Sequence, residues 1–175
     1  RGQGPADIME LTRTLAGEML LLAGKAASYE AGRAAFDRVI ADGSAFEKFA
    51  AMVENQGGDP SFIRDPEKFR RAEKTIPVTA PAAGFVTAMN SIRIGIASIM
   101  LGGGREKSED VIDHAVGIEV LKKTGDRVEA GEPLAILHAN PASRVDAALD
   151  LYRKAVGIGA AAPAARPLVV ERITA

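Results

Sequence analysis

Apolar residues in the first 58 positions recur with the spacing of α-helices. Pro5 suits the first turn of a helix and Gly24 suits a helix end, so the pattern predicts a helix over residues 5–23. The apolar positions that define this helix lie three or four residues apart: Ile8, Leu11, Leu15, Met19 and Leu22.

Two further helices are expected before residue 59. Ser28 is the predicted N-cap of the second, which ends at Asp42 and Gly43, and Ser44 is the predicted N-cap of the third, which ends at Gly57 and Gly58. Residues 59–75 hold two Asp-Pro steps and many charges. They are predicted to form a connector with at most a short helical turn.

The first helix has an unusually small polar surface. Ala16, Leu20 and Ala23 lie outside its main apolar stripe, so apolar side chains cover most of its circumference. Such a helix is expected to be buried within a larger assembly. The chain also opens on an arginine without an initiator methionine, and we expect it to be an interior piece of a longer polypeptide.

The periodicity changes at residue 76. The stretches "TIPVTAP" and "GFVTAMN" are typical of short strands, with Pro77 and Pro81 marking edges and turns. Glycine-containing turns also divide "GDRVEAGEPLAILHA" (125–139), whose apolar run begins at Pro133. We expect strands and turns over 113–139.

Helices are predicted at two places in this second part. "IRIGIASIMLGGG" (92–104) has apolar residues at 92, 96, 99 and 100 and ends in glycines, and residues 143–156 place Val145, Leu149 and Tyr152 on one face. The alanine-rich residues 157–167 are predicted to be a loop, and residues 168–173 a closing strand. The fold class is α+β: a helical segment (1–75) precedes a barrel-sandwich or hammerhead α+β module (76–175).

Composition excludes several classes of function. The 22 basic and 23 acidic side chains give no excess positive charge for a phosphate backbone, so no nucleic-acid partner is expected. The longest apolar run, "MLLLAG" (19–24), is far shorter than the ~20 residues that cross a bilayer, so no membrane partner is expected. The absence of cysteine excludes disulfides and Cys-ligated metals.

The hammerhead pattern raises the alternative of a biotinyl or lipoyl carrier. Such a domain exposes one lysine at a hairpin tip after the apolar strand. Lys122 and Lys123 precede that strand, and His138-Ala139-Asn140-Pro141 occupies the required place. A carrier or a simple assembly module therefore stays the weaker interpretation.

The remaining candidate chemistry is sparse. The "GGGR" stretch (102–105) follows a helix, where the dipole disfavours anions, so we expect a helix stop and turn, with a functional loop as the alternative. His114 and His138 lack neighbouring metal ligands, and we expect core or hydrogen-bonding roles for both. Ser108, Asp110, Asp113 and His114 follow one another too closely to converge as a triad.

Four stretches in order resemble the C-terminal part of the pyrimidine-nucleoside phosphorylase family, which includes thymidine phosphorylase. They are "GPADIMELTRTLAGEML" (4–20), "FEKFAAMVENQGGDP" (46–60), "VTAPAAGFVTAMNSIRIGIASIMLGGGRE" (78–106) and "DHAVGIEVLKKTGDRVEAGEPLAILHA" (113–139). The resemblance covers essentially the whole chain. It implies that residues 1–75 are helices of a larger α/β catalytic domain and that residues 76–175 are the C-terminal module.

The resemblance also implies an activity. It is the reversible phosphorolysis of thymidine or another pyrimidine nucleoside to base and (deoxy)ribose 1-phosphate, by a cytoplasmic homodimer that needs phosphate as co-substrate and no cofactor. In the family, a Lys and hydroxyl-rich loops grip the phosphate, and an Arg, a Ser and a Lys hold the base. All belong to the N-terminal two-thirds of the subunit, so no catalytic or substrate-binding residue is carried over to residues 1–175. The chain alone is expected to be inactive.

One indirect role follows from the resemblance. Domain closure brings phosphate and nucleoside together in the family, and the loop after the glycine-rich turn lies where closing contacts form. Its matching residues here are Arg105, Glu106, Lys107 and Ser108. The alternative enzyme is a nucleoside-monophosphate phosphorylase of the same superfamily.

Overall fold

The computed structural model describes residues 2–173 and divides the chain into two compact units. Among the described residues, unit 1 comprises 2–68 and 166–173, and unit 2 comprises 69–165. The chain therefore passes from unit 1 to unit 2 and back again. The sequence placed one boundary near residue 75 and contained no sign of the return.

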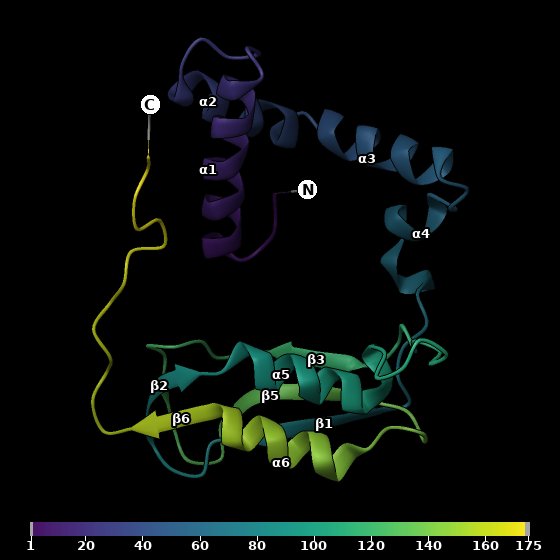
Figure 1. Cartoon of the computed structure of the whole chain (residues 1–175), viewed down its shortest axis with the longest axis vertical. Helices are drawn as coiled ribbons and strands as arrows, with labels where there is room; N and C mark the ends of the chain where they lie inside the picture. The colour runs from purple at the N-terminus through teal and green to yellow at the C-terminus, as the bar shows by residue number, and fades with distance from the viewer. Residues whose placement is uncertain (1, 174–175) are drawn as a thin grey trace. The chain divides into compact units, whose positions relative to one another are not determined.

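Unit 1 is helical (Figure 1). The three predicted helices are confirmed, and the connector forms two short helical turns. The elements are α1 (Ala6–Leu22), α2 (Tyr29–Ala41), α3 (Ser44–Asn55), α4 (Ser61–Arg64) and a 3-10 turn (Pro66–Lys68).

The two serine caps have different outcomes. Ser28 is the N-cap of α2, where its hydroxyl accepts a hydrogen bond from the Ala31 N–H at 3.1 Å. The prediction for Ser44 is wrong, because Gly43 caps α3 with a φ of 77°. The Ser44 N–H donates instead to the Asp42 carboxylate at 2.9 Å, which leaves Ser44 as the first helical residue.

Helices α1 and α2 pack closely because small residues meet at their contact. A Cβ atom on Gly32 would lie 2.6 Å from the Gly17 carbonyl oxygen, so only glycine fits there. Both residues are buried. On either side of this contact, Arg13 donates to both oxygens of Asp37, and Arg33 donates to Glu10.

Much of the apolar stripe of α1 stays exposed in this chain. Ile8, Leu15, Met19 and Leu22 are 52%, 55%, 69% and 85% exposed, although they belong to the apolar stripe that the sequence predicts as buried. Residues 2–173 therefore do not supply the larger assembly that this stripe predicts.

Unit 2 contains two antiparallel sheets of three strands each, which confirms the α+β class. The sheets do not close into a barrel, so the barrel part of the predicted module is not formed within the described residues. The first sheet has the order β1 (Lys74–Thr79), β5 (Pro133–Ala139), β3 (Gly117–Val120), and the second has the order β4 (Arg127–Val128), β2 (Gly84–Met89), β6 (Val156–Gly159).

The first sheet follows its sequence closely. The apolar run from Pro133 forms the central strand β5, which is the most buried strand of the sheet. Pro77 lies in β1, which is an edge strand. Proline has no N–H to donate, and an edge strand needs hydrogen bonds to only one neighbouring strand. Gly125 and Gly131 turn the chain with φ values of 100° and 81°.

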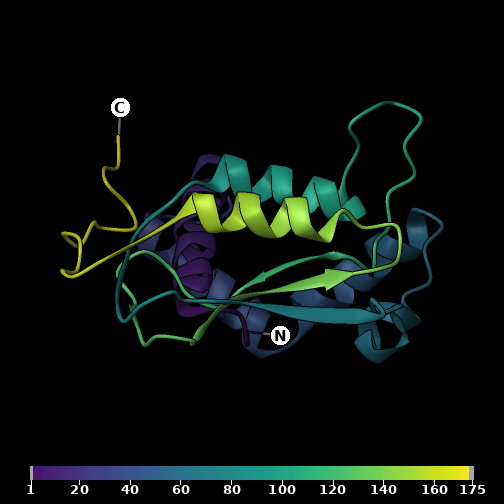
Figure 2. The same ribbon diagram turned by 90° about the horizontal axis from the view of Figure 1, so that it is seen from below.

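Two helices cover the first sheet and complete the core. Helix α5 (Ser91–Ser98) continues into a π-helical segment (Ile99–Gly103), and α6 (Val145–Ala155) lies beside α5 (Figures 1 and 2). Figure 2 shows both helices on the same side of β1, β3 and β5. The largest fully buried side chains of this core are Tyr152, Leu101, Leu137, Val78, Val86 and Val128.

Two predictions for residues 156–173 are wrong. Residues 156–159, assigned mostly to a loop, form β6, because Gly157 and Gly159 leave room for the Thr87 side chain of β2. Residues 168–173 form no strand. The buried face of α5 carries Ala97 and runs on to Leu101, whereas Ile92 and Ile96 are exposed.

Candidate functional site

The glycine-rich stretch ends the α5 helix and begins a long loop. Gly102 adopts a φ of 103°, a conformation that residues with a Cβ rarely adopt, and its carbonyl accepts a hydrogen bond from the Asp113 N–H at 3.0 Å. Residues 103–112 lie between these two points, and Figure 2 shows the loop rising from the end of the helix. The glycines form a helix stop, as predicted, and also close the base of this loop.

Asp110 organises the tip of the loop. Its carboxylate oxygen Oδ2 accepts hydrogen bonds from the N–H groups of Glu106 and Lys107, both at 2.9 Å. A single carboxylate therefore fixes the backbone of two of the four predicted closure residues.

Glu106 joins the loop to the start of α6. Its carboxylate forms an ion pair with the Arg144 guanidinium. The Arg144 N–H donates to the Met100 carbonyl at 3.0 Å, so the backbone of Arg144 is itself held to the end of the preceding helix. Glu106 therefore has a tethering contact within unit 2.

Asp113 and Asn140 hold the base of the loop. The Asn140 side-chain amide donates to Asp113 Oδ2 at 2.6 Å, and the Ala115 N–H donates to Asp113 Oδ1 at 3.0 Å. These two hydrogen bonds, that of Asn140 foremost, lower the pKa of the Asp113 carboxyl. Ser143 extends the network, because its hydroxyl donates to the Leu101 carbonyl at 2.6 Å.

Arg105, Lys107 and Ser108 are exposed on this supported loop. Within residues 2–173 the side chains of Arg105 and Lys107 have no hydrogen bond or ion pair, in contrast to Glu106. The loop thus presents two free cations on a backbone that Asp110 and Asp113 hold. Such an arrangement can make ion pairs with an acidic surface or an anion without first releasing an internal partner.

The sequence did not indicate the supporting residues. Arg144 lies 38 positions from Glu106 and Asn140 lies 27 positions from Asp113, and only the fold brings these residues together. The sole local sign was Asn140-Pro141, a turn dipeptide directly after the β5 strand.

The structure also places the residues of the rejected triad. The Asp110 carboxylate accepts from loop N–H groups, and the Asp113 carboxylate accepts from Asn140 and Ala115. Neither is arranged to orient His114. The second histidine, His138, lies on β5 with its Nε2 3.5 Å from the Glu119 carboxylate on β3. Among residues 2–173, no three His, Asp or Glu side chains gather in a way that could hold a metal ion.

Lys122 and Lys123, which the sequence places wrongly for a carrier, occupy a structured turn. Lys122 Nζ lies 2.5 Å from the Glu132 carboxylate, and both side chains are largely buried. The Lys123 N–H donates to the Asp126 carboxylate at 2.7 Å. In the described part of the chain, no helix is both long and apolar enough to cross a membrane.

Comparison with known proteins finds a family match within unit 2. Residues 85–159 match the pyrimidine nucleoside phosphorylase C-terminal domain. The chain is 46% identical over 140 residues to pyrimidine-nucleoside phosphorylase of Bacillus subtilis (strain 168). It is 47% identical over 140 residues to the proteins of the same name from Staphylococcus aureus strains USA300 and N315.

Each match covers 80% of this chain but only 32% of the relative. The chain therefore spans about one third of the length of these relatives. The matching domain includes α5, the 103–112 loop and α6. Residues 85–159 therefore belong to the family of pyrimidine nucleoside phosphorylase C-terminal domains, and the chain is similar to part of the pyrimidine-nucleoside phosphorylases.

Proposed function

We propose that this chain is the C-terminal part of an enzyme that catalyses the reversible phosphorolysis of pyrimidine nucleosides. Phosphate attacks the anomeric carbon of the sugar, the glycosidic bond breaks, and the base leaves with the bonding electron pair. The products are a pyrimidine base and a (deoxy)ribose 1-phosphate. The observation that carries this proposal is the 46% identity over 140 residues to a relative named pyrimidine-nucleoside phosphorylase.

In this proposal the chain itself contains no catalytic residue. The groups that hold phosphate and base lie in the portion of the relatives outside the match, which is about two thirds of their length. The proposal includes a cytoplasmic homodimer, with phosphate as co-substrate and no other cofactor. The substrate in this proposal is thymidine or another pyrimidine nucleoside.

Unit 2 contributes to catalysis through domain closure. The free cations of Arg105 and Lys107 make closing contacts, while Ser108 extends the same exposed surface. Glu106 keeps the loop in place through Arg144. Closure of this kind excludes water and aligns the two reactants, which matters when a charged nucleophile must approach the sugar in line.

A chimera tests the proposal. The part of the Bacillus subtilis relative that precedes the matched region is joined to this chain, and phosphate-dependent release of base from thymidine and uridine is measured. We expect activity in the chimera and none in the chain alone. Phosphorolysis by the purified chain at a rate near that of the chimera would refute the assignment of catalysis to the absent portion.

The loop is tested in the same chimera. Arg105→Ala with Lys107→Ala is expected to raise KM or lower kcat while thermal stability stays unchanged. The matched control, Lys25→Ala with Lys48→Ala, removes two exposed positive charges from unit 1 and is expected to leave the kinetics unchanged. Equal kinetics in both double variants would remove the closure role.

Two alternatives give different results in these experiments. A nucleoside-monophosphate phosphorylase would release base from uridine or thymidine monophosphate in preference to the nucleosides. A biotinyl or lipoyl carrier would gain a fixed mass on one lysine when expressed with the corresponding ligase. The ion pair between Lys122 and Glu132 argues against modification of that lysine.

A further inference from the structure

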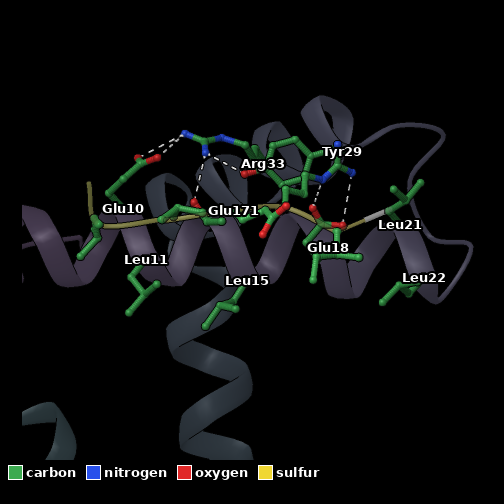
Figure 3. Close-up of a pocket in the computed structure, with 14 residues that line it drawn as sticks. Glu10, Leu11, Leu15, Glu18, Leu21, Leu22, Tyr29, Arg33 and Glu171 are labelled. Carbon is green, nitrogen blue, oxygen red and sulfur yellow. Dashed lines mark hydrogen bonds and ion pairs between the residues drawn. The ribbon is translucent and has the colours of Figure 1, made fainter. Parts of the chain in front are cut away.

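The last described residues of the chain return to unit 1 and lie against the α1–α2 pair. A cavity of about 760 Å³ lies there, bounded by side chains of α1 and α2 and by residues 168–173 (Figure 3). We call residues 166–173 the C-terminal segment and the surface of α1 and α2 beneath it the α1–α2 groove. Neither is assigned a role by the comparisons.

Arg172 makes the most specific contact of the C-terminal segment. Its Nε and Nη2 atoms donate to the two carboxylate oxygens of Glu18 on α1, the second at 3.3 Å. Its guanidinium carbon also lies 4.4 Å from the centre of the Tyr29 ring on α2. A planar cation held edge-on by a carboxylate and face-on by an aromatic ring is recognised by shape as well as by charge.

The receiving groups are themselves fixed. Arg33 donates to the Tyr29 hydroxyl at 3.0 Å and to the Glu10 carboxylate at 2.8 Å, so the ring that faces Arg172 cannot turn freely. Figure 3 shows Glu10, Arg33 and Tyr29 directed toward one another, whereas Leu11 and Leu15 point away from them. The groove therefore has a built polar wall of alternating charge and an apolar side.

Burial along the C-terminal segment follows the same division. Leu168 and Val169 are 48% and 39% exposed and line the cavity, whereas Val170 is 86% exposed. Arg172 keeps only 40% of its side chain exposed although it carries a charge, and Glu18 keeps 28%. The order of burial indicates that two apolar residues and one arginine, rather than the whole segment, make the contact.

We propose that the α1–α2 groove is a binding site for an arginine-bearing peptide segment, and that its occupant is the C-terminal segment of the same chain. Glu18 and Tyr29 bind the arginine, and Leu168 and Val169 add apolar contacts. Since the chain leaves unit 1 at residue 68 and re-enters it at residue 166, the bound segment fastens unit 2 at a second point.

The test uses the full chain and hydrogen exchange of its amides. Arg172→Ala is expected to speed exchange in the parts of α1 and α2 that line the groove by roughly two- to five-fold. Arg166→Ala removes the same charge from the same segment, but Arg166 does not line the cavity, so this control should leave exchange unchanged. Equal effects of the two variants, or no effect of either, would overturn the proposal.

A peptide added in trans separates loss of binding from loss of folding. A labelled peptide with the sequence of residues 166–173 is expected to bind the Arg172→Ala chain, whose own segment is released, more tightly than it binds the unaltered chain. Binding should disappear when Glu18→Ala is added or when the peptide itself carries Arg172→Ala. Equal binding in all these combinations would show that Arg172 is not recognised.

A mixing experiment checks that the occupant belongs to the same chain. Isotope-labelled and unlabelled copies of the chain are mixed and cross-linked between residues 18 and 172. The products are analysed by mass spectrometry. We expect cross-links within one copy. Cross-links between copies would overturn the assignment of the occupant, since the segment would then be exchanged between subunits.

Discussion

Gly17 and Gly32 meet where α1 packs against α2, so closely that a Cβ on Gly32 would lie 2.6 Å from the Gly17 carbonyl oxygen. The obstacle is backbone, which cannot swing aside like the end of a side chain. Gly32→Ala should therefore force the helices apart and destabilise unit 1 by about 1–3 kcal/mol. Thermal or urea unfolding, followed by probes in unit 1, measures the effect.

Gly95 provides the matched control. It lies within α5, and apart from its chain neighbours and the nearby backbone of the same helix, no atom lies within 4 Å of the position that its Cβ would take. Gly95→Ala is expected to stabilise unit 2 by about 0.5–1 kcal/mol, because alanine favours the helix and meets no obstacle. Gly32→Ala and Gly95→Ala changing stability in the same direction would contradict the close-contact explanation.

Asp110→Ala tests how the candidate loop is held. The Asp110 carboxylate accepts hydrogen bonds from the Glu106 and Lys107 N–H groups, so removing it should abolish the exchange protection of those two amides. Glu109→Ala alters the neighbouring acidic side chain and should preserve that protection. Protected Glu106 and Lys107 amides in the Asp110→Ala protein would show that other contacts support the loop.

Acid should weaken the base of the loop through Asp113. Hydrogen bonds from Asn140 and Ala115 lower the pKa of this carboxyl in the folded protein below the value near 3.9 of an unfolded chain. A depressed pKa contributes stability above the unfolded value, and this contribution is lost as pH falls through the folded value. Stability should therefore decrease more steeply below about pH 4 in the unaltered protein than in Asp113→Asn.

The measurement is the difference in unfolding temperature between these two proteins as a function of pH. Taking the difference removes the other carboxyl groups, which titrate in both. The difference should be largest near neutral pH and shrink in acid. A difference that is independent of pH would mean that the Asp113–Asn140 contact does not depend on ionisation.

The two tyrosines should titrate separately. Hydrogen bonds with Thr14 and Arg33 lower the pKa of Tyr29, whereas burial raises the pKa of Tyr152. Absorbance of tyrosinate during alkaline titration should rise in two steps, and Tyr29→Phe should remove the earlier one. Loss of the later step instead would reverse the assignment.

Tyr152 is expected to tolerate loss of its hydroxyl. The side chain is fully buried, and its hydroxyl has no hydrogen-bond partner among the described residues. Tyr152→Phe should be neutral or stabilising, because no hydrogen bond is lost and a buried polar group is removed. Tyr152→Ala should cost about 3–5 kcal/mol through the cavity it leaves. Destabilisation by Tyr152→Phe of more than about 1 kcal/mol would point to a partner for the hydroxyl.

Local periodicity predicted most of the elements. The three N-terminal helices, the strand from Pro133 and the helix that carries Tyr152 all follow from patterns within a few turns or residues. Local periodicity did not predict the β6 strand. Its glycines fit against the side chain of Thr87, which lies on a strand distant in the sequence, and strand propensity gives no sign of that contact. The spacing of apolar residues in α5 does not show which face is buried: the small Ala97 packs in the core, whereas Ile92 and Ile96 are exposed.

Only part of the candidate site could be predicted from the sequence. Arg105, Glu106, Lys107 and Ser108 were chosen through a family resemblance, whereas Arg144 and Asn140 support the loop from distant positions. The same limit applies to Arg172, whose partner Glu18 lies 154 residues away along the chain. Long-range ion pairs leave no periodic trace, so residues 168–173 were read by local propensity as a strand.

The most direct test of the central claim is the rate of phosphate-dependent base release from a pyrimidine nucleoside. It is measured for this chain joined to the preceding part of the Bacillus subtilis relative and for the chain alone. We expect the chimera to release base and sugar 1-phosphate, and the chain alone to release no base above background. A folded chimera that releases no base, or a chain that releases base by itself, would contradict it.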